Sequence, residues 1–78
     1  RYGSLRLVFE DKAPSRAEIK NILTRHKIEL LECSVDRNRT VRIFKIDLRY
    51  GFNVDFPEVT EDLYGELQDS GLTRIHWT

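Results

Sequence analysis

Hydrophobic and polar residues alternate in several short stretches of the chain, which is the pattern of strands with one buried face. Leu5–Phe9 places Leu5, Leu7 and Phe9 on one face and predicts a first strand. Ile28–Val35 and Thr40–Tyr50 predict the next two strands, and the turn-forming residues Asp36–Arg39 between them predict a hairpin. Gly71–Trp77 alternates again after a helical segment, so a closing strand is expected there.

Two other segments repeat hydrophobic residues every three or four positions, which is the spacing of an amphipathic helix. The first helix should begin at Arg16, because Ser15 and Glu18 have the spacing of a capping box. Its predicted core-facing stripe consists of Ile19, Ile22, Leu23 and His26. The second helix should begin at Pro57, because proline suits a first helical turn. Its predicted core-facing residues are Val59, Leu63 and Leu67 with Tyr64 beside them.

The hydrophobic positions of the hairpin change phase. On the second strand, the predicted core face carries Leu31, Cys33 and Val35. On the third strand, one parity carries Val41 and Ile43, and the other carries Phe44, Ile46 and Leu48. The change requires either a β-bulge near Ile43 and Phe44 or burial of both faces there. We favour the bulge, since the charged residues that follow keep the opposite face polar.

Gly65 lies inside the second predicted helix. Glycine there costs roughly 1 kcal/mol relative to alanine, because it loses more backbone entropy on folding. Such a cost is expected where a helix passes close to another backbone. The glycine therefore predicts a close approach at this position.

The elements follow one another as strand, helix, strand, strand, helix, strand. Two split βαβ units with right-handed crossovers give an α+β sandwich with a four-stranded antiparallel sheet in the spatial order fourth, first, third, second. Both helices then lie on one face of the sheet. This βαββαβ arrangement is the ferredoxin-like or ACT-like fold. We expect residues 1–78 to form a single domain, cut from a longer protein because the chain starts at Arg1 without an initiator methionine.

Composition excludes several classes of function. The 13 Lys+Arg residues balance 13 Asp+Glu residues, so there is no general attraction to nucleic acid or anionic lipid. Cys33 is the single cysteine of the sequence, which favours a reducing compartment. His26 and His76 are far apart in the sequence and Cys33 has no CxxC partner, so no metal or other cofactor is predicted. No apolar run approaches the roughly 20 residues of a transmembrane helix.

No catalytic residues are predicted, because the sequence has no glycine-rich phosphate loop and no nucleophile motif. RNA binding is the least favoured of the alternatives. The stretch Arg49–Phe56 resembles the RNP1 signature of RNA-binding domains, but Tyr50 occupies the position of its glycine. In the first strand, Arg6 occupies the position of the aromatic residue on which a base would stack. No nucleic-acid partner is therefore expected.

The topology also matches ACT domains, which sense amino acids. Their ligand sites usually depend on a glycine-containing turn after the first strand, whose amides hold the ligand carboxylate. Here that turn is Asp11–Ser15, which has no glycine and begins with an acidic residue. The chain therefore predicts an ACT-like frame without the amino-acid site, and small-ligand sensing is the alternative function.

A resemblance to one family rests on four segments, which are Leu5–Phe9, Glu29–Asp36, Val41–Ile46 and Leu67–Trp77. The last contains the most telling feature, a Gly-x-x-x-apolar-x-Trp ending. Together they resemble the C-terminal cytoplasmic domain of the MgtC/SapB family of bacterial membrane proteins. The resemblance implies a non-enzymatic regulatory or protein-interaction domain linked to magnesium homeostasis or transport. It further implies transmembrane helices before Arg1 and a place at the cytoplasmic face of the cell membrane.

The second strand should lie at an edge of the sheet, where its backbone can pair with another chain. Glu29, Leu30 and Glu32 form a candidate interaction edge, with Leu30 on its less polar side. Acidic residues along an edge typically block strand addition. The expected partner is therefore another protein or a second copy of the chain, and we expect a monomer or weak dimer in isolation.

Overall fold

The chain alternates strands and helices in the predicted order. The structure is a computed structural model, and it describes residues 1–10 and 12–78. The elements are β1 (Tyr2–Glu10), α1 (Arg16–Arg25), β2 (Ile28–Asn38), β3 (Val41–Tyr50), α2 (Phe56–Leu67), a short 3-10 helix (Gln68–Ser70) and β4 (Leu72–Trp77). The polar turn predicted after the first strand includes Asp11, which lies outside the described residues.

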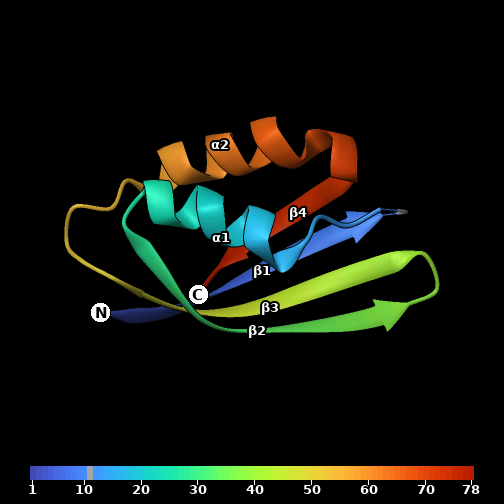
Figure 1. Cartoon of the computed structure of the whole chain (residues 1–78), viewed down its shortest axis with the longest axis horizontal. Helices are drawn as coiled ribbons and strands as arrows, with labels where there is room; N and C mark the ends of the chain where they lie inside the picture. The colour runs from blue at the N-terminus through green and yellow to red at the C-terminus, as the bar shows by residue number, and fades with distance from the viewer. Residues whose placement is uncertain (11) are drawn as a thin grey trace.

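The described strands form a single four-stranded sheet in the order β2-β3-β1-β4. Every pairing is antiparallel, so the predicted topology and strand order are confirmed. Helices α1 and α2 lie side by side on one face of this sheet, and the other face is uncovered by any element of the described chain (Figure 1). The fold is therefore the predicted two-layer α+β sandwich.

The core lies between the sheet and the two helices. Its buried side chains are Leu5, Leu7, Phe9, Ile19, Ile22, Leu23, Ile28, Leu30, Phe44, Ile46, Leu48, Val59, Leu63, Leu67 and Leu72. Cys33, which was predicted to face the core, is partly buried and packs against it, as do Ile75 and Trp77. The prediction for Leu31 is wrong, because this side chain is 42% exposed.

A bulge in β2 explains the exposure of Leu31. The register between β2 and β3 shifts between Leu30 and Glu32, which leaves Leu31 as the extra residue. Leu30 consequently points into the core. Pairing of β1 with β3 runs without interruption along the whole of β1, so the bulge predicted near Ile43 and Phe44 is wrong. Ile43 instead lies half-buried on the uncovered face of the sheet.

Side-chain caps begin both helices. The Oγ of Ser15 accepts a hydrogen bond of 3.2 Å from the backbone N–H of Glu18, which confirms the predicted start of α1 at Arg16. A carboxylate oxygen of Asp55 accepts one of 3.2 Å from the N–H of Glu58, so α2 begins one residue before the predicted start at Pro57. Each cap satisfies an amide that the helix itself leaves free.

The two glycines near α2 have different surroundings. Gly71 follows the 3-10 helix with a left-handed backbone, φ 79°, and so ends the helical segment as glycine commonly does. A Cβ placed on Gly65 would have no atom within 4 Å apart from its neighbours in the backbone of α2. The predicted close approach at Gly65 is therefore wrong, because this residue lies on the exposed side of α2.

Candidate interaction surfaces

The predicted interaction edge is an edge in the structure, since β2 is the outermost strand on one side of the sheet. Glu29 and Glu32 are exposed, and Glu29 forms an ion pair of 2.8 Å with Arg49 on β3. Leu30 is 8% exposed, so only its backbone is available at the edge. The bulge at Leu31 interrupts the line of the edge, which hinders continuous pairing with an added strand. A binding role for this edge stays a prediction.

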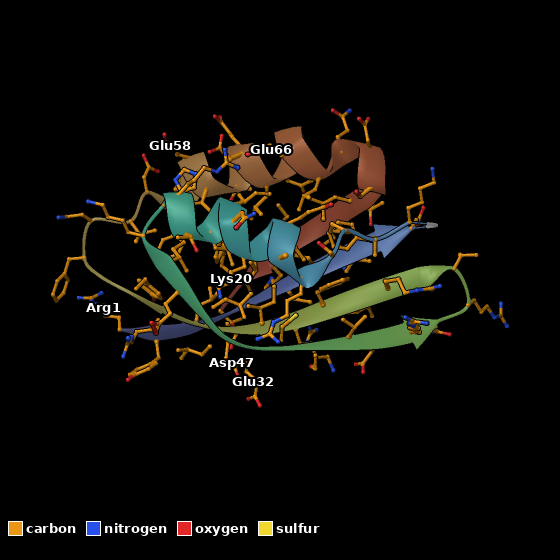
Figure 2. The ribbon with its side chains drawn as sticks, viewed as in Figure 1. Arg1, Lys20, Glu32, Asp47, Glu58 and Glu66 are labelled. Atoms are coloured by element: carbon orange, nitrogen blue, oxygen red, sulfur yellow. The ribbon has the colours of Figure 1, made fainter. Side chains whose placement is uncertain are left out.

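The uncovered face of the hairpin carries the expected charged side chains. The Nζ of Lys45 lies 2.8 Å from a carboxylate oxygen of Asp36, so opposite charges pair across the two strands there. Glu32 and Asp47 lie opposite each other in register. In Figure 2 both point away from the helices, on the uncovered side of the sheet. Like charges directly opposite on neighbouring strands are destabilising.

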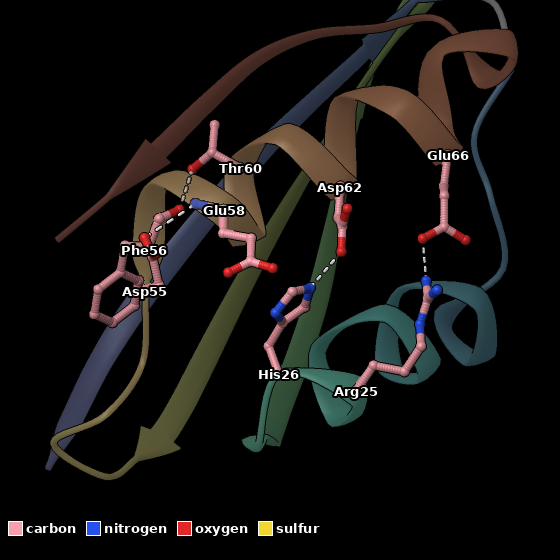
Figure 3. A network of polar contacts seen from close by, with 8 residues as sticks. All are labelled: Arg25, His26, Asp55, Phe56, Glu58, Thr60, Asp62 and Glu66. Atoms are coloured by element: carbon pink, nitrogen blue, oxygen red, sulfur yellow. Dashed lines mark hydrogen bonds and ion pairs between the residues drawn. The ribbon is translucent and has the colours of Figure 1, made fainter.

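Ion pairs join the two helices to each other. Figure 3 shows Arg25 at the end of α1 paired with Glu66 of α2, and His26 paired with Asp62 of α2. The Nε2 of His26 lies 2.5 Å from a carboxylate oxygen of Asp62. His26, predicted to be part of the core-facing stripe, therefore lies between the helices and holds them together. Sequence reasoning missed this contact, because its partners are 36 positions apart and share no local pattern.

Aromatic side chains close one end of the sandwich. The ring of Phe56 contacts those of Tyr50 and Trp77 edge-on, with centroid distances of 5.0 and 4.9 Å. Trp77 also donates a hydrogen bond of 2.8 Å from Nε1 to the Oγ1 of Thr60. The tryptophan of the Gly-x-x-x-apolar-x-Trp ending thus has a structural role, since it connects the end of β4 to α2. A small cavity of about 180 Å³ lies against the three rings and Leu48.

Cys33 is half-buried on β2. Burial raises the pKa of its thiol, and the positive charge of Arg16 acts in the opposite direction with the smaller effect. A raised pKa leaves less thiolate at a given pH, and the thiolate is the reactive form. We therefore expect iodoacetamide to alkylate Cys33 more slowly in the folded chain than in denaturant at the same mildly alkaline pH. Equal rates followed by mass spectrometry would contradict this environment.

Among residues 1–10 and 12–78, no group of three or more His, Cys, Asp or Glu side chains is placed to hold a metal ion. None of the described helices has the length and apolar character needed to cross a membrane. The side chains that the structure does bring together are therefore those of the ion pairs, the aromatic end and the uncovered sheet face.

Comparison with known proteins gives matches to solved structures. A scan against protein-family models finds no match, and a search of the curated proteins finds none either. The chain is similar to the C-terminal domain of the MgtC protein from Mycobacterium tuberculosis, with 22% identity and a TM-score of 0.71 over 99% of this chain and 84% of that one. It is similar to the ACT domain from GTP pyrophosphokinase of Chlorobium tepidum, with 13% identity and a TM-score of 0.60 over 99% and 96%.

A formyltetrahydrofolate deformylase from Pseudomonas putida KT2440 is also similar, with 11% identity and a TM-score of 0.78. All of this chain is covered in that match, but the chain spans only 28% of the deformylase. These likenesses establish the fold, and the chain has an ACT-like fold. The resemblance to the MgtC C-terminal domain, predicted from the sequence, is confirmed at the level of the fold.

Proposed function

We propose that this chain is a regulatory or protein-interaction domain without catalytic activity, and that it is the tail of an MgtC/SapB-like membrane protein. The observation that supports this most is the match to the MgtC C-terminal domain, which covers 84% of that structure at 22% identity. By analogy the tail would lie at the cytoplasmic face of the cell membrane, and its protein would take part in magnesium homeostasis or transport. The location and the role are transferred from the MgtC protein by analogy of fold, and fold alone does not determine function.

The surroundings of the reactive side chains support a non-catalytic role. Catalysis by histidine needs a ring nitrogen within reach of a substrate, whereas the His26 side chain is only 15% exposed and is paired with Asp62 between the two helices. Catalysis by cysteine needs an activated thiolate, whereas burial raises the pKa of the Cys33 thiol. Both side chains therefore contribute to the packing of the domain.

Small-ligand sensing is the second candidate, because the ACT domain of the GTP pyrophosphokinase matches almost end to end. The turn after β1 is where an ACT domain would hold an amino acid. Its described residues, Lys12 to Ser15, contain no glycine. A larger side chain there restricts the close approach that a backbone amide cradle needs. This favours the interaction role over sensing.

Membrane fractionation of the natural gene product tests the proposed function. A tag fused after Thr78 should sediment with the membranes and be released by detergent but not by high salt. Protease should remove the tag in inverted vesicles and leave it intact in spheroplasts, because the tail is proposed to face the cytoplasm. A tagged protein that stays in the soluble fraction would contradict the proposal.

We expect the domain itself to bind neither magnesium nor zinc with useful affinity. Divalent cations need several converging ligands, whereas carboxylates such as Asp36 and Glu29 are paired with basic side chains. The melting temperature should be the same with a chelator, with magnesium and with zinc. A saturable calorimetric binding curve in the micromolar range would contradict this and make the domain a direct metal sensor.

A further inference from the structure

The tip of the β2–β3 hairpin carries three arginines, Arg37, Arg39 and Arg42. Arg37 and Arg39 are exposed, and Arg42 is half-buried. The Nη1 of Arg42 donates hydrogen bonds of 3.0 and 3.3 Å to the backbone carbonyls of Arg39 and Val41. The ion pairs found among the described residues include none of the three arginines. Their positive charge is therefore not neutralised within the described part of the chain.

The described acidic residues near the tip point to the other side of the sheet. The strand registers place Glu10 and Asp36 on the uncovered face, and Asp36 is paired with Lys45. Arg37 and Arg42 alternate with these positions, so they continue the core face of the sheet. In Figure 1 the hairpin extends past the ends of both helices. The arginine side of the tip is thus open to a partner.

Two features of the tip reduce local stability. Arg37 lies directly opposite Arg42 in register, and like charges directly opposite on neighbouring strands are destabilising. Arg39 has a left-handed backbone, φ 57°, which glycine and asparagine adopt more readily than a residue with a long side chain. Contact with a negatively charged surface would offset both costs, and residues in strained conformations are often found at functional sites.

Charge is unevenly distributed along the chain, although it balances overall. Every charged residue from Arg37 to Ile46 is basic, and every charged residue from Tyr50 to Thr73 is acidic. The second segment includes α2, which packs against β4 at the opposite edge of the sheet from β2. Figure 1 shows α2 and β2 on opposite sides of the molecule. An anionic surface would attract the hairpin tip and repel α2, so it would also orient the domain.

We infer that the hairpin tip docks on the anionic lipid headgroups of the membrane surface. This docking role rests on the proposed function, which places the chain at the cytoplasmic face of the cell membrane, where the leaflet carries anionic lipids. Val35 is exposed and shares a face with Arg37. Its aliphatic side chain suits the boundary between the headgroups and the hydrocarbon.

Nucleic acid is a poorer match for this surface. Single-stranded RNA is bound largely by stacking its bases on aromatic side chains. The exposed aromatic side chains, Tyr2, Phe52 and Tyr64, lie on β1, in the β3–α2 loop and on α2. The tip therefore offers positive charge without a surface on which bases would stack.

The expected contact is weak. Each arginine near an anionic membrane should strengthen binding about fivefold, which is about 1 kcal/mol. Three arginines then give roughly a hundredfold. A contact of this strength is suited to orienting a domain that its own chain already holds at the membrane, because tethering raises the local concentration of the tip at the lipid surface.

A pair of glycine variants separates the charge of the tip from its backbone conformation. Arg39→Gly removes one charge, and glycine adopts the left-handed conformation without strain. Lys27→Gly is the matched control, because Lys27 is also exposed and left-handed, φ 61°. The 11 residues of β2 lie between the two positions and separate them by roughly 35 Å, several Debye lengths at about 0.1 M salt. Circular dichroism should show that neither variant melts at a lower temperature than the natural chain.

Co-sedimentation with lipid vesicles at low ionic strength measures the binding. The test vesicles contain equal parts of phosphatidylglycerol and phosphatidylcholine, and the reference vesicles contain phosphatidylcholine alone. We expect the natural chain to bind only the anionic vesicles and to dissociate as salt is added. Arg39→Gly should bind them about fivefold more weakly. Arg39→Lys, which keeps the charge, and Lys27→Gly should bind within about twofold of the natural chain.

Three results would overturn the docking role. They are a natural chain that does not distinguish the two kinds of vesicle, equal effects of Arg39→Gly and Lys27→Gly, and tighter binding to a single-stranded RNA oligonucleotide than to the anionic vesicles. The vesicle experiment uses the isolated chain, so its outcome is independent of the membrane fractionation. A protein found in the soluble fraction would contradict the proposed function even if the tip binds vesicles. A membrane protein whose tail fails to bind vesicles would contradict only the docking role.

Discussion

Replacing Gly71 with alanine should destabilise the domain more than any other addition of a single methyl group to its glycines. A Cβ at this position would lie 2.1 Å from the carbonyl oxygen of Glu10, and the backbone is left-handed with φ 79°. The left-handed conformation alone costs a residue with a side chain roughly 1–2 kcal/mol. The contacted atom belongs to the backbone of β1, whose Glu10 N–H donates to the carbonyl of Gly71 at 2.9 Å. Relief of the clash would therefore break the start of the β1–β4 pairing.

We expect Gly71→Ala to lower the free energy of unfolding by about 3–5 kcal/mol, a loss reserved for strain and severe packing defects. Chemical denaturation followed by circular dichroism measures it. Gly65→Ala is the matched control, because its Cβ meets open space. In a helix this change should stabilise by about 0.5–1 kcal/mol. Similar effects of the two substitutions would contradict the turn that joins α2 to β4.

Leu23→Ala should cost about 2–5 kcal/mol of unfolding free energy, as for other large-to-small changes in a core. Leu23 is fully buried between α1 and the sheet, with 0% exposure. The substitution removes apolar contact and leaves a cavity that the neighbouring strands cannot close. Urea denaturation at equilibrium measures the loss.

Leu31→Ala is the control, because it makes the same chemical change at the β2 bulge. Its side chain is 42% exposed, so the cost should be within about 0.5 kcal/mol of zero. If Leu31→Ala costs as much as Leu23→Ala, Leu31 belongs to the core. That result would support the predicted core face of Leu31, Cys33 and Val35 and contradict the bulge.

Element types and their order could be predicted because each follows from a local pattern. The alternation of residues 5–9 and the three-to-four spacing after Ser15 depend on neighbours along the chain, and both elements form as predicted. Strand order followed from the handedness of the two crossovers. The likeness to the MgtC tail was also accessible, because its segments extend along nearly the whole chain.

Features that depend on register could not be predicted in the same way. Leu30 and Leu31 are adjacent and equally hydrophobic, so the pattern permits either one to face the core. The β2–β3 pairing decides for Leu30. The contact of His26 with Asp62 and the open space around Gly65 likewise depend on how the helices pack. Residues of the uncovered sheet face come from all four described strands, so this surface forms only after the sheet is assembled.

Two-dimensional ¹H–¹⁵N NMR spectra of the labelled chain distinguish a protein-interaction domain from a domain that binds a small ligand. Saturating amino acids and magnesium should leave all amide signals unchanged. The contradicting result is a set of saturable shifts in the turn between β1 and α1 on addition of an amino acid.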